Sequence, residues 1–272
     1  MRHIHEIPIL KTPEEIDIMR SAGRIVAGAL KIAGVMAVPG QTTRRIDEEV
    51  ERFIRDSGAE PTFKGYPSVN KQVPPFPASI CASVNEVVVH GIPDDRILKE
   101  GDILSVDVGV YWRGFCSDAA KTFAIGHISE KARRLMDTTE AALKAAVAVT
   151  KQGAGLKDIA LAVETIARKN KFSVVRSFVG HGIGRSMHEA PQVPNYVEGL
   201  LETASGKTGL GRLRFSAGLV LAIEPMLTAG TEKVVTDRHN GWTVFTKDHS
   251  LAAHFEHTVA VTEQGPQILT LE

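Results

Sequence analysis

The chain has 272 residues, of which 43% are hydrophobic and 24% are charged, as in an ordinary globular protein. Its formal net charge is zero, which gives no electrostatic basis for binding nucleic acid or an anionic membrane surface. It has two cysteines, Cys81 and Cys116, so we expect neither a disulfide scaffold nor a cysteine-ligated zinc site. No apolar run approaches transmembrane length and the start does not resemble a signal peptide, so we expect a cytoplasmic protein.

The first half of the chain is predicted to pass from helices to strands. Thr12 precedes Pro13 and Glu15, a capping pattern typical of a helix start. The second amphipathic segment stops at Gly58. The predicted elements, in chain order, are a helix over 13–35, a helix over 42–57, a proline-rich and aromatic loop over 60–78, and strands over 80–124.

The second half is predicted to repeat this order. Helices are expected over 130–150 and 156–170, followed by strands to the end and a long loop over 197–215. The glycine-rich run at 179–184 resembles a phosphate-binding loop only weakly, because we expect loop after it rather than an apolar helix. Cys81 has no basic activator nearby, which argues against a thiol nucleophile.

Three landmarks recur in the two halves. His90-Gly-Ile recurs as His181-Gly-Ile, the run from Gly101 to Asp107 recurs from Gly218 to Glu224, and the strand that Asp118 begins has a counterpart begun by Glu256. We therefore expect one catalytic domain, 1–272, built from two pseudo-symmetric halves. The halves would span about 13–126 and 129–265, after a short N-terminal extension, 1–12. They would face each other across a cleft.

Asp107 and Asp118 lie eleven residues apart in a segment that resembles a β-hairpin, with turn chemistry near Gly114. With symmetric pairing, we expect Asp107 directly opposite Asp118, with Cβ atoms about 5 Å apart. Alternate residues from Leu104 to Val110 are apolar and form the opposite face. Two carboxylates held together need a proton or a cation between them, and a divalent metal ion is a common answer. A shared proton or a solvated surface pair remains the alternative.

Five candidate metal ligands follow from the hairpin and the repeat: Asp107, Asp118, His181, Glu224 and Glu256. Each acid lies in a strand pattern, where acids are disfavoured. Singly, each has a structural interpretation; Glu256, for instance, would pair with a lysine such as Lys247. Together, four acids and one histidine fit a site for two divalent ions better than any ion-pairing scheme. One imidazole among carboxylates favours manganese, iron or cobalt over a closed structural zinc site, but does not determine the ion.

Several motifs resemble a known family. They are Leu10–Ile16, Ser83–Asp95, Gly180–Arg185 with His188-Glu, Ile223–Met226, Gly241–Val244 and Phe255–Thr258. Over nearly the whole chain they resemble type I methionine aminopeptidase, a pita-bread metallopeptidase. The resemblance implies an α+β fold, in which a pseudo-twofold repeat forms a largely antiparallel curved sheet backed by helices. It also implies that the protein removes the initiator methionine from nascent polypeptides, through water activated by two divalent ions, cobalt, manganese, iron or zinc.

The resemblance implies a role for each site residue. Asp107 would bind one ion, His181 and Glu224 the other, and Asp118 and Glu256 would bridge both. Glu224 would also shuttle the proton of the attacking water, and His90 and His188 would hydrogen-bond the substrate and stabilise the tetrahedral intermediate. The methionine pocket would include Cys81, Met187 and Trp242, with Tyr66, Phe76 and Phe63 as candidate walls. Met187 stands where many relatives carry an aromatic residue.

Two other functions compete with this interpretation. An Xaa-Pro aminopeptidase or prolidase would share the metal ligands, but such enzymes usually carry an extra N-terminal domain. A non-enzymatic binding protein on the same fold would be expected to lose ligands, and all five are present. Type II methionine enzymes carry a long helical insert, for which 197–215 is too short. The segments 67–75 and 197–215 look longer than in typical relatives, which affects substrate access rather than chemistry. We expect a monomer acting on methionine peptides and nascent chains; proximity to the ribosome is open.

Overall fold

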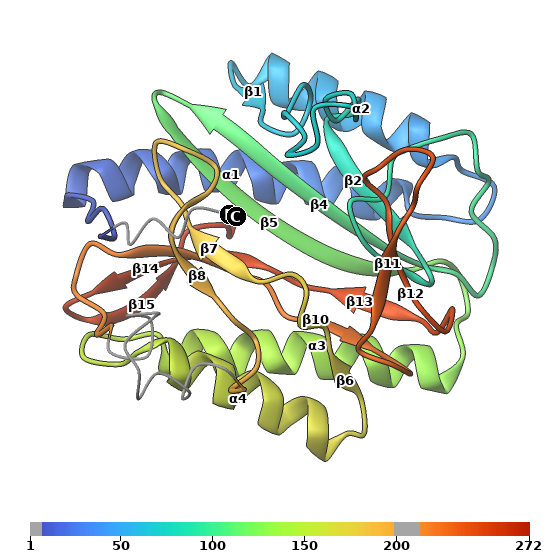
Figure 1. Ribbon diagram of the computed structural model, residues 1–272. Helices are drawn as coiled ribbons and strands as arrows, with labels where there is room; N and C mark the ends of the chain where they lie inside the picture. The colour runs from blue at the N-terminus through green and yellow to red at the C-terminus, as the bar shows by residue number, and fades with distance from the viewer. Residues whose placement is uncertain (1–6, 199–212) are drawn as a thin grey trace.

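The computed structural model describes residues 7–198 and 213–272 (Figure 1). The helices are α1 (Pro13–Met36), α2 (Thr43–Asp56), α3 (Glu130–Val149) and α4 (Leu156–Lys169). The strands of the first half are β1 (Glu60–Pro61), β2 (Ile80–Val84), β3 (Val87–Val89), β4 (Ile103–Trp112) and β5 (Phe115–Ala124). Those of the second half are β6 (Ser173–Val174), β7 (Gly180–Gly182), β8 (Glu189–Val193), β9 (Val220–Ile223), β10 (Met226–Thr228), β11 (Val234–Thr236), β12 (Val244–Thr246), β13 (Ala252–His254), β14 (His257–Thr262) and β15 (Gly265–Ile268).

The first helix begins where the capping pattern predicted. The Thr12 side chain accepts a hydrogen bond from the Glu15 amide, and the Glu15 carboxylate accepts one from the Thr12 amide, which satisfies two amides that the helix leaves unpaired. All four helices lie within two residues of the predicted ranges. None of the helices in the described ranges is long and apolar enough to cross a bilayer.

The strands form antiparallel sheets between two helical layers. In Figure 1, α1 and α2 cover one side of the strands, and α3 and α4 cover the opposite side. One sheet has the order β1-β4-β2 with β5 beside β4, and another has the order β15-β14-β9-β7-β8. Separate buried clusters join each helix pair to its sheet, one including Val26 and Val106 and the other Leu135 and Val259. The predicted α+β class with largely antiparallel strands is confirmed.

The hairpin of β4 and β5 has a register different from the predicted one. Asp107 pairs with Ala120, and Asp118 pairs with Gly109, so the aspartates are diagonal neighbours and not directly opposed. The turn residues are Arg113 and Gly114, with φ values of 49° and 89°. Two successive positive φ values are typical of a two-residue hairpin turn, whose twist matches that of the paired strands. The centre of the hairpin therefore lies between Arg113 and Gly114, one residue later than predicted. The register moves by two residues, so both aspartates keep the same face.

The segment after Gly184 was predicted to be loop, and this was wrong for residues 189–193. These residues form β8, which pairs with β7 at the edge of its sheet. Pro191 argued against a strand, but an edge strand tolerates proline because one side of it needs no ladder hydrogen bonds. The pairing of β7 with β8 is irregular, with a register shift between His181 and Gly182. The loop predicted over 60–78 is confirmed apart from the two residues of β1. Residues 199–212 of the predicted loop over 197–215, and 1–6 of the N-terminal extension, lie outside the described residues.

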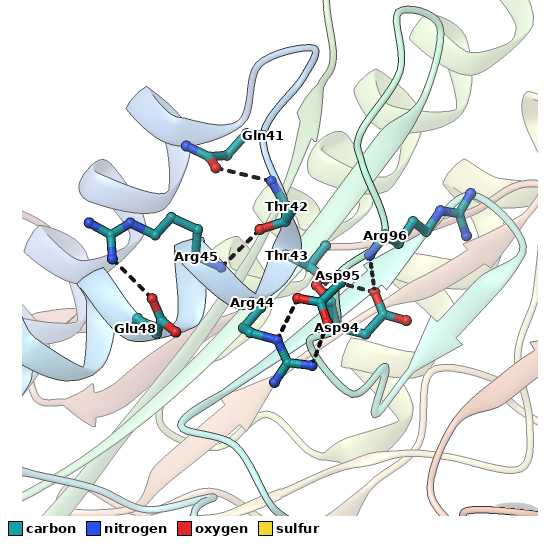
Figure 2. A network of polar contacts seen from close by, with 9 residues as sticks. All are labelled: Gln41, Thr42, Thr43, Arg44, Arg45, Glu48, Asp94, Asp95 and Arg96. Atoms are coloured by element: carbon teal, nitrogen blue, oxygen red, sulfur yellow. Dashed lines mark hydrogen bonds and ion pairs between the residues drawn. The ribbon is translucent and has the colours of Figure 1, made fainter.

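A polar network joins the start of α2 to the loop that follows His90 (Figure 2). Thr43 Oγ1 accepts a hydrogen bond from the Asp94 amide at 2.9 Å and donates to the Asp94 carbonyl at 3.1 Å. Arg44 makes a two-pronged contact with Asp95, at 2.7 and 3.1 Å. The exposed pair of Arg44 and Asp95 contributes little to stability, but the contacts of the buried Thr43 fix the path of the loop that follows His90.

Candidate metal centre

A cavity of about 240 Å³ opens where the two sheets meet, and all five predicted metal ligands line it. The residues that line it are Phe63, Tyr66, Pro67, Val69, Phe76, Cys81, His90, Asp107, Asp118, His181, His188, Glu224, Trp242 and Glu256. One part of the wall is therefore acidic and imidazole-rich, and the other is aromatic and apolar. Such a cavity, with a few polar groups in an apolar wall, is typical of a small-molecule or peptide site.

The acids come from matching places in the two sheets. Asp107 and Asp118 lie within β4 and β5, Glu224 follows β9, and Glu256 precedes β14. The β14 and β9 strands pair so that His257 faces Ile223, which brings the two glutamates to the same end of the sheet. Glu256 donates its amide hydrogen to Ala120 of β5 at 2.8 Å, so backbone hydrogen bonding joins the two halves beside the site.

His181 is oriented as a ligand. Its Nδ1 lies 2.9 Å from the Gly182 carbonyl oxygen, which can only accept, so Nδ1 carries the hydrogen and the lone pair is on Nε2. Nε2 faces the carboxylates and lies 3.7 Å from Glu224 Oε1. Ligand atoms of Asp118, His181 and Glu256 all lie within 4.8 Å of one another, close enough to share one cation. Burial lowers the pKa of His181 to about 3, which keeps this lone pair free of a proton.

Burial raises the pKa of all four acids. The pKa of Asp107 rises to about 6 and that of Glu224 to about 8, in each case chiefly because the carboxylate is removed from water. Burial, with repulsion from the neighbouring carboxylates, raises the pKa values of Asp118 and Glu256 well above the ordinary range. Four carboxylates that are largely removed from water in one cavity therefore need protons or cations to balance their charge.

The unpaired carboxylate oxygens of these acids fit metal ions. One oxygen each of Asp107, Asp118 and Glu256 is buried and has no hydrogen-bond partner among the described residues. Buried polar atoms are almost always paired, so three unpaired oxygens in one cavity indicate a missing partner of opposite charge. Carboxylate oxygen with one imidazole is a donor set suited to divalent ions such as manganese, iron or cobalt. The alternative pairing of Glu256 with Lys247 is absent from the ion pairs of the described residues.

The two predicted non-ligand histidines also line the cavity. His90 adopts a left-handed conformation with φ of 58°, directly after β3, and its ring packs edge-on against Phe178 and Trp242. Burial lowers the pKa of His90 to about 4 and also lowers that of His188, so both rings are neutral near pH 7. His188 Nδ1 lies 2.6 Å from the Tyr66 hydroxyl, which ties the loop after Gly184 to the aromatic loop.

The predicted apolar walls are present, with one exception. Phe63, Phe76, Cys81 and Trp242 line the cavity, and Phe76 packs edge-on against Trp242 at 5.3 Å between ring centroids. Met187 does not line the cavity; it is buried behind the wall, in the same apolar cluster as Phe63 and Cys81. These four residues form an apolar recess beside the acids that suits an unbranched thioether side chain.

His254 was missed by the sequence analysis. It ends β13, is buried, and points Nε2 toward Glu224 and Glu256 at 3.5 and 4.0 Å. It has no counterpart in the internal repeat, which is why the repeat did not reveal it. Its spacing of two from Glu256 could have done so, because residues i and i+2 of an extended chain share a face.

Comparisons with known proteins agree with this geometry. The model of the family described as metallopeptidase family M24 matches residues 17–263. The chain is 45% identical to methionine aminopeptidase 1 of Bacillus subtilis, over 96% of this chain and 98% of that protein. It is 47% identical to the methionine aminopeptidase of Clostridium acetobutylicum, over 97% and 98%.

Solved structures agree with the curated relatives. The crystal structure of methionine aminopeptidase from Thermotoga maritima matches with a TM-score of 0.88 at 39% identity, covering 98% of this chain and all of that one. The prolidase from Pyrococcus furiosus shares the fold, with a TM-score of 0.73 at 23% identity, but this chain covers only 66% of it. Sequence identity and coverage of the full length therefore distinguish the methionine aminopeptidases from the prolidases as relatives of this chain. The chain belongs to the methionine aminopeptidases of metallopeptidase family M24.

Proposed function

We propose that this enzyme, a metal-dependent hydrolase, removes the initiator methionine from polypeptides at the cavity between the two sheets. The observation that carries the proposal is that four carboxylates, two of them buried and two half-buried, and the Nε2 of His181 lie beside an apolar aromatic recess. The recess takes the methionine side chain, and the charged wall takes the free amine and the first peptide bond. Nascent chains with an exposed N-terminal methionine are the partners that this geometry suits.

The five ligands are proposed to hold two divalent ions. Asp107 would bind one ion, His181 and Glu224 the other, and Asp118 and Glu256 both. This assignment is supported by the ligand atoms of Asp118, His181 and Glu256, which all lie within 4.8 Å of one another. When bound, the ions would lower the pKa of a water molecule and polarise the carbonyl of the first peptide bond.

Glu224 is proposed to move the proton. Its carboxylate would accept a proton from the attacking water and release it to the leaving amine. Glu224 lies between the imidazoles of His181 and His254, which restrict its rotation. A base held in one orientation needs no reorganisation during the reaction.

His90 and His188 are proposed to bind the substrate. Both are neutral, so each can offer one N–H to the carbonyl oxygen as it gains negative charge. Tyr66 orients His188: an imidazole nitrogen is a better acceptor than a phenolic oxygen, so the hydroxyl donates to Nδ1 and leaves Nε2–H to face the cavity. Cys81, Phe76 and Trp242 would pack against the methionine side chain, and Met187 would support them from behind.

We also propose that the chain is one catalytic domain, 1–272, of two related halves, 13–126 and 129–265. Gly101 and Gly218, which precede the matched acid-bearing strands, have φ values of 95° and 93°. This local likeness supports a common plan for the two halves, because only glycine adopts such a conformation readily.

The experiment compares Asp118→Ala and Glu256→Ala with Glu263→Ala, an exposed acid just beyond β14. Each protein is freed of metal, supplied with Mn²⁺, and assayed on Met-Ala-Ser. We expect the first two variants to lose activity and the third to keep it, with thermal unfolding of the metal-free proteins showing that each is folded. Retained turnover in Asp118→Ala or Glu256→Ala at saturating Mn²⁺ would contradict the assigned ligands.

A further inference from the structure

His254 is buried beside the cavity, next to Glu224, and is not one of the residues that line it. Its side chain is 2% exposed, and its Nε2 has no hydrogen-bond partner among the described residues. The nearest polar atoms are Glu224 Oε2 at 3.5 Å and Glu256 Oε2 at 4.0 Å. A buried polar nitrogen that lacks a partner costs stability, and the closest acceptor for a hydrogen on Nε2 is Glu224 Oε2.

The backbone of His254 is fixed from both sides. Its amide and its carbonyl both bond to Thr122 Oγ1 on β5, at 3.0 and 2.8 Å. Ser105 Oγ on β4 lies 2.9 Å from the same hydroxyl. On its other side, His254 pairs with Met226 of β10, two residues after Glu224. The imidazole therefore has little freedom to move, and it faces the acids because the strand holds it there.

Glu224 lies between two imidazoles. His181 Nε2 is 3.7 Å from Glu224 Oε1, and His254 Nε2 is 3.5 Å from Glu224 Oε2. His181 is one of the three residues whose ligand atoms come together, and His254 is not. The two imidazoles therefore contact different oxygens of the carboxylate, and only His181 belongs to the group that could hold a cation.

We propose that His254 is a positioning residue for the metal centre: it donates Nε2–H to Glu224 Oε2 and so keeps Oε1 on the side of His181, where Glu224 would bind an ion. The proposal rests on the proposed metal centre and adds a residue that is not one of its ligands. Donors that hold a metal-binding carboxylate in place typically change metal affinity or activity by 10- to 100-fold when removed.

The test compares His254→Gln with His254→Asn. Glutamine can place its amide N–H close to the position of Nε2, whereas asparagine is one methylene shorter and leaves Glu224 without a donor. Both residues are polar and smaller than or similar to histidine, so both are expected to fold, which thermal unfolding of the metal-free proteins checks. His239→Asn, at an exposed histidine, is the control.

Metal-free proteins are titrated with Mn²⁺ by calorimetry. We expect wild type and the His239→Asn control to bind two ions, His254→Asn to bind the weaker ion about 10- to 100-fold less tightly, and His254→Gln to match wild type within a few-fold. At saturating Mn²⁺, the Asn variant should turn over Met-Ala-Ser with lower kcat and unchanged KM.

Three results would overturn the proposal. Unchanged Mn²⁺ affinity in His254→Asn would show that the imidazole does not position Glu224. Equal loss in the Gln and Asn variants would show that the ring acts in some way other than as a donor. Failure of wild type to bind two Mn²⁺ ions would contradict the proposed metal centre itself, and therefore also the positioning function of His254. The first two results would contradict the positioning function alone, so the two kinds of failure are distinguishable.

Discussion

The ion pair between Lys11 and Glu189 gives the sharpest stability prediction. Lys11 Nζ lies 2.6 Å from Glu189 Oε2, and the two side chains are only 2% and 7% exposed. Lys11 also donates to the Ile9 carbonyl at 2.8 Å, and Glu189 Oε1 accepts from the Ser186 amide at 3.1 Å. The pair joins the segment before α1 to the loop that carries His188, so it supports this part of the cavity wall as well as the fold.

Replacing Lys11 by methionine keeps the length of the side chain but leaves Glu189 buried without its cation. Removing one partner of a buried pair costs about 3–5 kcal/mol, because the remaining charge stays out of water. In the double variant Lys11→Met/Glu189→Gln no charge remains, and the glutamine carbonyl can still accept from Ser186. We therefore expect Lys11→Met to lose about 3–5 kcal/mol and the double variant to recover most of that loss.

Urea unfolding of the metal-free proteins measures these free energies. The control is Arg20→Met, because Arg20 and Asp17 lie 2.7 Å apart, almost the same distance, but are 40% and 64% exposed. An exposed pair is worth about 0–1 kcal/mol, so the control should change little. A Lys11→Met variant no less stable than Arg20→Met, or a double variant less stable than Lys11→Met, would refute the reasoning from burial.

Three further predictions follow from the site. Tyr66→Phe keeps the aromatic ring but removes the donor to His188, so kcat/KM for Met-Ala-Ser should fall by up to about tenfold, the value of one hydrogen bond. In Gly109→Ala, the new Cβ would clash with Thr62 Oγ1 and would stand 2.9 Å from Met187 Cε and 3.1 Å from a Phe63 ring carbon. These neighbours must shift, which changes the shape of the apolar wall, so KM should rise while kcat changes little. The free energy of unfolding of the metal-free protein should fall as pH rises from 6.5 to 8, on the order of 1 kcal/mol, as thermal unfolding in EDTA can measure. Over that window the folded state still holds a proton on Glu224, with its pKa of about 8, which the unfolded chain has released.

Each of these has a discriminating control. Tyr111→Phe, at an exposed tyrosine, should leave kcat/KM unchanged, and an equal fall in both tyrosine variants would contradict the function of the Tyr66 hydroxyl. Mn²⁺ affinity should be the same in Gly109→Ala and wild type, since the nearest atoms to the added methyl group belong to Thr62, Met187 and Phe63, none of which is a proposed ligand. Saturating Mn²⁺ should abolish or reverse the loss of stability with pH; a metal-free protein whose stability rises from pH 6.5 to 8 would contradict the raised pKa.

Local signals predicted much of the fold. The capping residues Thr12 and Glu15 set the start of α1, because they satisfy amides that only a helix leaves unpaired. The hairpin register was not predictable from alternation, since alternation is unchanged by a shift of two residues. The φ values of Arg113 and Gly114 determined it. β8 was missed because Pro191 opposes a strand everywhere except at a sheet edge, and the order of strands depends on tertiary contacts.

The candidate site was predictable where two independent patterns met. The internal repeat and the disfavoured acids both pointed to Glu224 and Glu256, and the cavity contains both. His254 belonged to neither pattern, because it is not an acid and is not among the landmarks that recur in the two halves. That Met187 lies behind the wall depends on side-chain direction in an irregular loop, which sequence spacing does not specify.

The most direct test of the account is metal-dependent peptide cleavage, measured anaerobically. The metal-free protein is titrated with Mn²⁺ and assayed on Met-Ala-Ser and on a matched Xaa-Pro peptide. We predict no activity without metal, full activity as two ions bind per chain, and release of free methionine from Met-Ala-Ser with the Xaa-Pro peptide intact. Cleavage of the Xaa-Pro peptide with Met-Ala-Ser intact, or full activity in metal-free protein, would contradict the account.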